Sequence, residues 1–518
     1  MTDEQSSRSR AIIHISILLA VAFCVGVYLV STTVLIAKDG ITFIEYARNL
    51  ETSPIKAMKS EYQHPGYPFL IIVAHKIAKI GHDGSSLWSW IYSAQAVAMI
   101  FRLLTVVLLY FVGKKIVGER FSFWAILILI LLPDAAEYGS DALSDWPYIF
   151  FLSAGFLLLI QGAVSGKWWL FGFSGLAAGM GYLIRPECAQ VVVFGTLWLG
   201  LQVFYSGRII SKRKAVSAFA LLLVGFLIIA GPYMKLKGAV FPKKQLVQFV
   251  PSTFAKATAD KNTQSSKVYE QGIRICSNSV YAAGFAPSDI AGAWGKLVQR
   301  VSETLVWFFV PALLIGMYKH LGRRNWCEPE RFFTIALIAL NVSVMILLYC
   351  KFGYMSRRHT LPLVIFTIFY VPAGLEALAS WLNEKFSKAI ERLFAVKANA
   401  DFWFMVLLVI GIAICSPKLL RPIRADKQSY RDAARWLAKN TDEKDIIAVP
   451  DIRIGFYSGR RSVEYDGRAV PKEAQYVVKV FEDEKDMLSG EEMLQTKEVF
   501  SIEGKGKESK VIIYRQKH

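Results

Sequence analysis

Residues 101–151 read FRLLTVVLLYFVGKKIVGERFSFWAILILILLPDAAEYGSDALSDWPYIFF, and apolar and charged segments alternate along them. Two apolar runs, at 91–112 and 121–133, flank a short basic loop, and an acidic loop follows the second run. A helix needs about 20 apolar residues to span the hydrocarbon core of a bilayer, and shorter runs can borrow flanking residues or tilt. This stretch therefore predicts two consecutive membrane helices, with a basic loop on one side of the membrane and an acidic loop on the other.

The whole chain has the composition of a membrane protein. Of its 518 residues, 54% are apolar, 13% are aromatic and only 19% are charged, which indicates a chain solvated mainly by lipid. By the length criterion we expect about eleven spans. They lie near residues 11–35, 91–112, 121–133, 147–164, 168–184, 189–205, 215–233, 301–318, 332–350, 361–382 and 402–416.

The basic residues predict the orientation of these spans. The first apolar run follows Arg8 and Arg10, but it is longer than the apolar core of a signal peptide and lacks a small-residue cleavage site. We therefore expect an uncleaved span with a cytosolic N-terminus, in a multi-pass protein of the cell inner (plasma) membrane. Alternate short loops are rich in Lys and Arg, as cytosolic loops should be. The loop clusters are Lys114, Lys115 and Arg120; Arg208, Lys212, Arg213 and Lys214; Lys319, Arg323, Arg324 and Arg331; and Lys385, Lys388 and Arg392.

The same distribution bears on possible partners. The net charge of +19 is mostly a topology signal, because the basic residues are dispersed through loops rather than gathered on one soluble face. Nucleic acid is therefore not an expected partner, whereas membrane lipids are. Six cysteines show no paired spacing and do not indicate a disulfide framework or a zinc site. One bridge between Cys188 and Cys276 stays open, because both could lie outside.

The chain divides into a membrane domain, residues 1–419, and a small α/β domain, residues 420–518, that we expect outside. The first outer loop, 36–90, belongs to the membrane domain and contains two stretches with helical apolar spacing, 39–50 and 68–80, which should lie in the interface plane. Between them, YQHPGYP predicts a turn. A second outer segment contains STFAKATADKNTQSS, which is typical of a mobile loop.

The tail combines helical and strand patterns. SYRDAARWLAKN, at 429–440, has the apolar spacing of an amphipathic helix, and DIIAVP, at 445–450, that of a short buried strand. GFYSGRRSVEYDG and KVIIYRQ, at 455–467 and 510–516, are typical of strands and turns.

Two polar residues of the first outer loop have more than one interpretation. Asp39 stands just before a helical pattern, where it could be an N-cap. It could also be a general base held at the membrane surface. His64 precedes Pro65 in the predicted turn, where a structural histidine is the simpler interpretation, since a lone His does not make a metal site.

Charged residues near the predicted span ends are further candidates. Asp141 and Asp145 are four residues apart, a spacing that puts them on one face if the segment is helical, and they could bind a cation or a sugar, or cap the next span. Arg102 lies within a span and Arg185 between two spans, and charges at membrane depth are functional candidates by default.

A basic cluster follows a later span, in YMSRRHTLPL. Arg357 and Arg358 could bind a lipid phosphate, because guanidinium groups match phosphate with a fork of donors. They could equally anchor the span among the headgroups.

In this order the motifs resemble the GT-C superfamily of membrane glycosyltransferases that use polyprenyl-phosphate sugars, in particular the bacterial relatives of protein O-mannosyltransferases and of the lipid A aminoarabinose transferase. The resemblance covers most of the chain, and the order of the motifs makes it specific. The segments that carry it are AKDGITFIEYARNL, HPGYPFL, the stretch 101–151, GLAAGMGYLIRPE, SRRHTLPL and the tail YRDAARWLAKNTDEKDIIAVPDIRIGFYSGR.

The resemblance implies a GT-C fold and assigns roles to individual residues. It implies that Asp39, which takes the place of the acidic residue opening the first outer loop, is the general base of an inverting transfer. The next residue of the family is often a second acid, whereas here it is Gly40. The substrate-binding positions that we expect, including Asp141 from its position in the acidic loop, are His64, Arg102, Asp141, Asp145, Arg185, Arg357 and Arg358.

The expected activity is transfer of a sugar from a polyprenyl-phosphate donor to a hydroxyl group of a lipid, glycan or protein acceptor on the outer face. No residues are assigned to a metal, although related enzymes differ in whether they need a divalent cation. Two alternatives are a multi-span transporter or flippase of a lipid-linked sugar, which also needs charges at membrane depth, and a non-catalytic relative that binds lipid-linked sugar.

Overall fold

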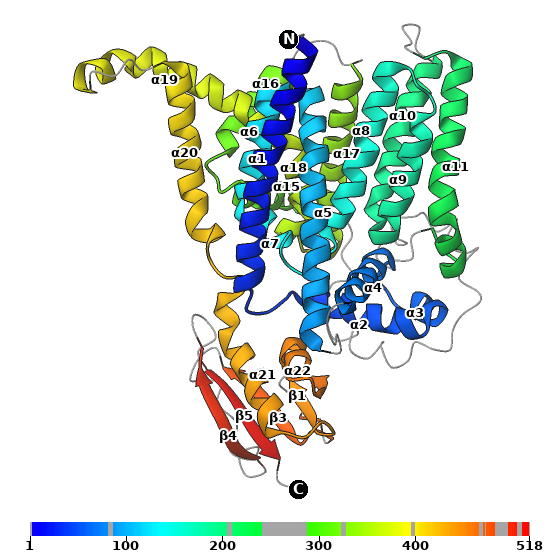
Figure 1. The fold of residues 1–518 in the computed structure, drawn as a ribbon, viewed down its shortest axis with the longest axis vertical. Helices are drawn as coiled ribbons and strands as arrows, with labels where there is room; N and C mark the ends of the chain where they lie inside the picture. The colour runs from blue at the N-terminus through cyan, green and yellow to red at the C-terminus, as the bar shows by residue number, and fades with distance from the viewer. Residues whose placement is uncertain are drawn as a thin grey trace.

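The computed structural model is a helical bundle with a small sheet-containing part at one end (Figure 1). It describes residues 3–80, 86–204, 210–240, 287–322, 328–394, 399–465, 470–471, 473–481, 496–504 and 510–516. The predicted mobile loop at 252–266 and Cys276 lie outside these residues. Cys188 is a free, buried cysteine.

Eight segments of the described chain are helical, long and apolar enough to cross a membrane. They comprise α1 (Asp3–Thr32), α5 (Leu87–Ile116), α8 (Asp145–Ser165), η1 with α10 (Pro186–Ala189 and Gln190–Phe204), α11 (Lys212–Lys237), α17 (Pro329–Phe352), α18 with η2 and α19 (Arg357–Thr367, Ile368–Tyr370 and Val371–Phe394) and α20 (Ala400–Leu419). The chain is therefore a multi-pass membrane protein.

The three remaining predicted spans coincide with shorter helices. They are α6 (Glu119–Leu131), α9 (Leu170–Ile184) and α16 (Val310–Leu321), which stand within the bundle (Figure 1). We expected one helix at 301–318, but the run contains a break: α15 (Pro287–Thr304) ends within it at Thr304, and α16 begins at Val310. Val306 and Trp307 in this break have φ of 48° and 62°. Such left-handed conformations are costly for residues other than glycine and interrupt a right-handed helix.

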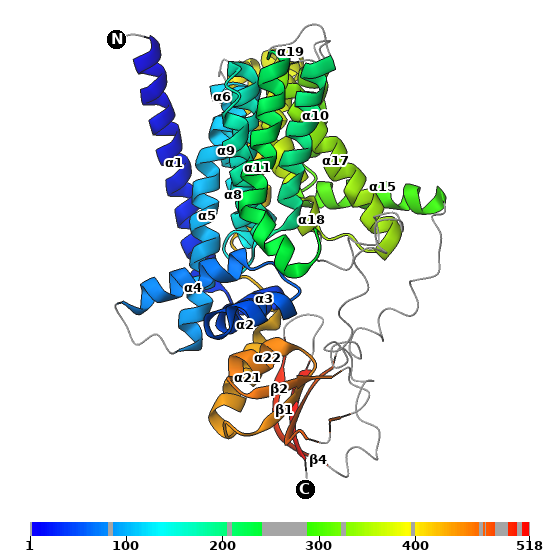
Figure 2. The same ribbon diagram turned by 90° about the vertical axis from the view of Figure 1, so that its right-hand side faces the viewer.

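Three short helices follow α1 and lie across one end of the bundle (Figures 1 and 2). They are α2 (Lys38–Thr52), α3 (Pro54–Ser60) and α4 (Gly66–Lys79). The two predicted helices correspond to α2 and α4, and α2 buries its apolar face, including Ile41, Ile44 and Ala47. Gly66 begins α4 where a Cβ atom would approach the carbonyl oxygen of Leu183 to 2.7 Å, so the turn packs closely on the end of α9.

The acidic loop differs from its predicted form. α7 (Pro133–Tyr138) is followed by a non-helical turn, and α8 begins at Asp145. Asp141 lies in the turn, so Asp141 and Asp145 do not share a helical face. Gly139 opens this turn where no larger residue would fit, because a Cβ atom there would lie 2.7 Å from the indole nitrogen of Trp146.

The C-terminal part contains a five-stranded sheet with the order β2-β1-β3-β5-β4. Its elements are η3 (Ala425–Lys427), α21 (Gln428–Asn440), β1 (Ile446–Val449), α22 (Ile452–Ser458), β2 (Arg461–Glu464), β3 (Tyr476–Phe481), β4 (Thr496–Glu503) and β5 (Lys510–Gln516). β1 is parallel to β2 and β3, and β5 is antiparallel to β3 and β4. The helix at 429–440 and the strands at 446–449 and 510–516 are as predicted. The stretch 455–467, predicted as strand and turn, contains β2, but its first residues, 455–458, belong to the helix α22.

Candidate active site

Four helix ends converge at the end of the bundle that carries α2. Asp39 lies in the first turn of α2, Asp145 begins α8, Arg185 follows α9, and Arg358 lies in the first turn of α18. Ion pairs join these four residues, which we call the site network. They are separated by up to 319 positions in the sequence, so the bundle and not local structure brings them together.

The charges of the site network alternate along a chain of contacts. Arg358 donates from Nη1 to Asp39 Oδ2 at 2.5 Å, and from Nε and Nη2 to Asp145 Oδ2 at 3.1 and 2.8 Å. Arg185 lies with Nη2 3.1 Å from Asp145 Oδ1, and its Nε donates to Ser144 Oγ at 3.1 Å. Two guanidinium groups thus compensate the buried carboxylate of Asp145, which would otherwise be costly.

The two carboxylates of the site network differ in access to solvent. The side chain of Asp145 is 2% exposed and that of Asp39 is 48% exposed. Asp39 therefore presents an open carboxylate beside a fixed guanidinium, while Asp145 holds both arginines from beneath. A phosphate could meet Arg358 and Arg185 by charge and by the fork of their N–H donors.

Asp39 is not the N-cap of α2, which was one of its two interpretations. The N-cap residue is Ala37, and no side chain caps the helix there. Asp39 lies two residues after Ala37, in the first turn of α2, where its charge still interacts favourably with the positive end of the helix dipole. Its carboxylate accepts a hydrogen bond from Arg358 and does not cap the helix.

The structure gives a steric reason for the glycine at position 40. A Cβ atom at this position would lie 2.8 Å from the carbonyl oxygen and 2.9 Å from the Cβ atom of Ala142. The start of α2 therefore packs against the turn before α8 too closely for a second acidic side chain. The second carboxylate of the site comes instead from Asp145, through Arg358.

Asp141 and Arg357 belong to separate ion pairs. Asp141 is fully buried, accepts backbone hydrogen bonds from Ala37 and Ala142 at 3.1 and 2.8 Å, and pairs with Arg424 at 2.7 Å. Burial alone would lower the pKa of Arg424, but the carboxylates of Asp141 and Glu137 outweigh it and hold this pKa above its usual value. These contacts join the turn before α8 to the loop that opens the C-terminal part.

The partner of Arg357 is Asp134 in α7. Arg357 Nη1 lies 3.0 Å from Asp134 Oδ1, and Lys418 Nζ of α20 lies 2.6 Å from the same oxygen. Although Arg357 and Arg358 are adjacent in the sequence, Arg358 contacts Asp39 and Asp145 whereas Arg357 contacts Asp134. We call the pairs of Asp134 with Arg357 and Lys418, and of Asp141 with Arg424, the scaffold pairs.

Arg102 and His64 contact residues other than those of the site network and the scaffold pairs. Arg102 is fully buried in α5, donates from Nη2 to the carbonyl oxygen of Ile130 at 2.9 Å and lies over Trp146. His64 has Nδ1 2.7 Å from the carbonyl oxygen of Tyr182. None of these contacts reaches the site network, so the structure does not join these two residues to it.

The site network does not suit a divalent cation. Arg358 lies between the carboxylates of Asp39 and Asp145 and binds both, so a fixed positive charge fills the position where a cation would need their oxygens. In the part of the chain that the structure describes, no group of three or more His, Cys, Asp or Glu side chains could hold a metal ion.

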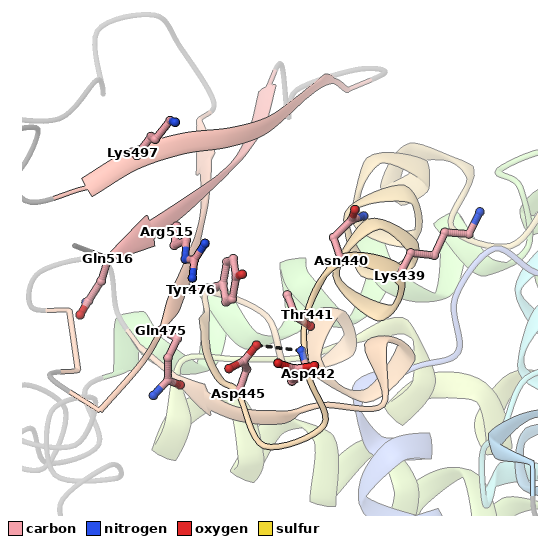
Figure 3. A pocket seen from close by; sticks show the side chains of 10 residues that line it. All are labelled: Lys439, Asn440, Thr441, Asp442, Asp445, Gln475, Tyr476, Lys497, Arg515 and Gln516. Carbon is pink, nitrogen blue, oxygen red and sulfur yellow. Dashed lines mark hydrogen bonds between the residues drawn. The ribbon is translucent and has the colours of Figure 1, made fainter. Parts of the chain in front are cut away.

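A cavity lies apart from the site network, in the C-terminal part. It has a volume of about 710 Å³ and lies between the end of α21 and the edges of β3, β4 and β5, with Tyr476, Arg515 and Lys497 among its lining residues (Figure 3). All of its lining residues come from positions 439–516, so it shares none with the site network.

Several residues around the site were not predicted from the sequence. Ser144 orients Arg185, and Arg424, Arg431 and Tyr457 bind the backbone just before Asp39. Serine, arginine and tyrosine are ordinary in turns and on short helices, and no motif marks Arg424, Arg431 or Tyr457. A signal that could have been used is the SDWP sequence at 144–147, where a polar residue precedes a helix start.

Comparisons with known proteins agree with this architecture. A family model described as dolichyl-phosphate-mannose-protein mannosyltransferase matches residues 63–230. No curated protein matched the sequence. Among solved structures, ArnT from Cupriavidus metallidurans bound to undecaprenyl phosphate is similar, with a TM-score of 0.55, 13% identity and coverage of 98% of both chains.

A second similar structure is the archaeal oligosaccharyltransferase AglB from Archaeoglobus fulgidus, in complex with an inhibitory peptide and a dolichol-phosphate. Its TM-score is 0.53 at 11% identity, and the match covers 91% of this chain and 69% of that one. At such identities the likeness establishes the fold. The family resemblance seen in the sequence is thereby confirmed, and the chain has the fold of the GT-C superfamily of membrane glycosyltransferases.

Proposed function

We propose that this protein transfers a sugar from a polyprenyl-phosphate donor to a hydroxyl group of a lipid, glycan or protein acceptor at the outer face of the inner membrane. The observation that carries the proposal is the site network, in which a half-exposed carboxylate, Asp39, adjoins a guanidinium that a buried carboxylate holds in place. The family match and the ArnT and AglB likeness support a lipid-linked donor.

The membrane determines where the donor reacts. Its polyprenyl tail stays in the hydrocarbon, so the sugar–phosphate bond lies at the interface, at the level of the short helices α2, α3 and α4 that cross the end of the bundle (Figure 2). The basic loop between α5 and α6 and the start of α11 lie at the opposite end, with the N-terminus (Figure 1). By the positive-inside rule, that end is cytosolic and the site network is outside.

In the proposed reaction the acceptor hydroxyl oxygen attacks the anomeric carbon of the donor sugar. The bond between that carbon and the phosphate oxygen breaks, and its electron pair leaves with the polyprenyl phosphate. Asp39 takes the hydroxyl proton, a contribution of about 10²- to 10⁴-fold for a general base. The attack from the face opposite the phosphate inverts the anomeric configuration.

The arginines serve the leaving group. Arg358 and Arg185 present N–H donors to the charge that develops on the phosphate, and such preorganised donors act most strongly where water is partly excluded. Asp145 orients both of them. In this proposal Arg358 exchanges part of its contact with Asp39 for the donor phosphate, which leaves the carboxylate open to the acceptor.

Mass spectrometry of envelope lipids, glycans and proteins from cells with and without the gene tests the proposal and identifies donor and acceptor. We expect one glycosylated acceptor to disappear and its lipid-linked sugar donor to accumulate at the outer face. Loss of the donor from the outer face, with accumulation inside, would instead indicate a flippase and contradict the proposal.

A further inference from the structure

The segment between α1 and α2, residues 33–37, is not helical and leads directly into Asp39. Its backbone is bound by the C-terminal part almost residue by residue. Val34 donates to the carbonyl oxygen of Ile423 at 3.1 Å, and its own carbonyl oxygen accepts from Arg431 Nη1 at 2.6 Å. These bonds begin five residues before Asp39.

The next two residues are held in the same way. The carbonyl oxygen of Leu35 accepts from Arg424 Nη1 at 3.0 Å, and the amide of Ile36 donates to the hydroxyl oxygen of Tyr457 at 3.0 Å. Burial raises the pKa of Tyr457 to about 12, so this hydroxyl is neutral and remains a suitable partner for a backbone amide over the physiological pH range.

The side chains of the segment belong to two different cores. Leu35 is fully buried in the core of the C-terminal part, with Tyr430 and Leu437 of α21. Ile36 and Ala37 are buried in the core of the membrane bundle. Consecutive residues therefore tie the two cores together, so a movement of the C-terminal part would pull on the peptide that precedes Asp39.

Arg424 extends this connection to the acidic turn. Besides Leu35, it binds Asp141 Oδ2 through Nη2 at 2.7 Å, and Asp141 Oδ1 accepts from the amide of Ala37 at 3.1 Å. Arg424 has a φ of 55°, a left-handed conformation that persists in a non-glycine residue only when its surroundings hold it. Lys38 is the residue before Asp39, and its Nζ lies 3.1 Å from Oε1 of Glu464 in β2.

We propose that the C-terminal part is a positioning element of the active site, in which Arg424, Arg431 and Tyr457 hold residues 34–36 so that the Asp39 carboxylate meets Arg358. The role of Asp39 rests on the proposed function, whereas the docking itself does not. A simple tether between two folded parts would not need to bind three successive peptide units, nor to bury Leu35 in a foreign core. A shift of about 1 Å in a reacting group can cost 10²-fold in rate, so such precision has a catalytic consequence.

The test uses the full chain in detergent and the variant Tyr457→Phe, which removes the partner of the Ile36 amide but keeps the ring that stacks near Arg431 and Trp88. The matched control is Tyr465→Phe. It removes a buried tyrosine hydrogen bond of 2.9 Å to Val478 within the same sheet-containing part, away from residues 33–38.

Two readouts are followed, hydrogen exchange of the peptide covering residues 33–40 and carbodiimide labelling of the Asp39 carboxylate, with Glu45 of the same helix as the internal reference. For Tyr457→Phe we expect exchange at Ile36 to rise about fivefold, as loss of one buried hydrogen bond would allow. Labelling of Asp39 should rise by a factor of about two or more on the same basis, with Glu45 unchanged. Tyr465→Phe should leave both readouts at wild-type values.

Unchanged exchange, or raised exchange without a change in Asp39 labelling, would overturn the proposal. So would equal effects of Tyr457→Phe and Tyr465→Phe, because they would indicate general loosening. Neither readout depends on sugar transfer. If Asp39 proves dispensable for turnover, the proposed function fails while the docking is still tested. Once donor and acceptor are identified, Tyr457→Phe should lower kcat more than it changes KM for the donor.

Discussion

The site network and the scaffold pairs lie at the same end of the bundle and use the same residue types, yet they differ in what they leave open. In the site network, Asp39 is 48% exposed and Arg358 is shared between two carboxylates. In the scaffold pairs, the side chain of Asp134 is 2% exposed and that of Asp141 is fully buried. The oxygens of Asp134 bind cationic side chains, and those of Asp141 bind a cationic side chain and backbone amides. A network with an exposed member can exchange a partner for substrate, whereas a closed one can only hold elements together.

The comparison predicts the largest loss of stability for Asp145, the buried carboxylate of the site network. Asp145→Asn keeps the side-chain size but leaves Arg185 and Arg358 without their shared countercharge. Removing one partner of a buried ion pair costs about 3–5 kcal/mol, so we expect a large fall in thermal stability and in the yield of folded protein. Thermal denaturation in detergent checks this. A wild-type melting temperature would show that the two arginines are solvated and that the network is not closed beneath Asp145.

The next largest effect is expected for donor binding, in which the adjacent residues Arg357 and Arg358 should differ. Arg358→Ala should weaken binding of undecaprenyl phosphate by at least about tenfold, because a charge-assisted hydrogen bond contributes about 1.5–3 kcal/mol. Arg358→Lys should recover only part of it, since the fork geometry is lost. Arg357→Ala is the matched control and should change binding less than about threefold on the same scale, because its partner is Asp134. Equal losses in both variants, measured by titration of the purified protein, would place Arg357 in the donor site as well.

A smaller effect is expected for Asp134→Asn among the scaffold pairs. Arg357 and Lys418 are 36% and 43% exposed, so water can solvate both when the carboxylate is lost. We expect a destabilisation of about 1 kcal/mol, the upper range for exposed pairs, and unchanged turnover per folded molecule. Stability and activity are measured on the same preparation. Turnover that falls in excess of the folded fraction would assign Asp134 to the site.

The smallest effect is expected from metal removal. Because Arg358 fills the position between Asp39 and Asp145, transfer should continue after dialysis against EDTA, with a change of less than about twofold, well within what one lost weak contact would cause. Adding Mg²⁺ or Mn²⁺ afterwards serves as the control. Activity that is lost with EDTA and restored by either cation would show that a metal displaces Arg358 during turnover.

The fold was largely predictable because lipid imposes simple rules on the sequence. Each of the eleven apolar runs overlaps at least one described helix, and the interfacial helices α2 and α4 were visible as apolar spacing. The break at Val306 and Trp307 was not, because neither residue is a glycine or a proline that would announce it. The helix α22 was missed, and its last residues, 455–458, were included in a predicted strand-and-turn stretch, because this helix is only seven residues long and rich in β-favouring side chains.

The sequence marked candidate site residues but not their partners. Charges at span ends singled out Asp39, Asp145, Arg185 and Arg358 among other candidates, and the structure joins these four by ion pairs. Their roles in binding and catalysis stay predictions. The spacing of Asp141 and Asp145 suggested one helical face, and the turn before α8 separates them. Whether Arg357 or Arg358 faces Asp39 depends on how α18 is rotated against α2, which no local pattern encodes.

The most direct measurement of the central claim is the turnover of Asp39→Asn on the identified donor and acceptor, with Glu45→Gln, a carboxylate change on the same helix, as the control. Asparagine keeps the size of the side chain and can still bind Arg358 through its carbonyl oxygen, so folding and undecaprenyl phosphate binding should be close to wild type. The account predicts turnover reduced by roughly two or more orders of magnitude, the scale of a lost general base, and wild-type turnover for Glu45→Gln. Wild-type turnover of Asp39→Asn would contradict the proposed role of Asp39.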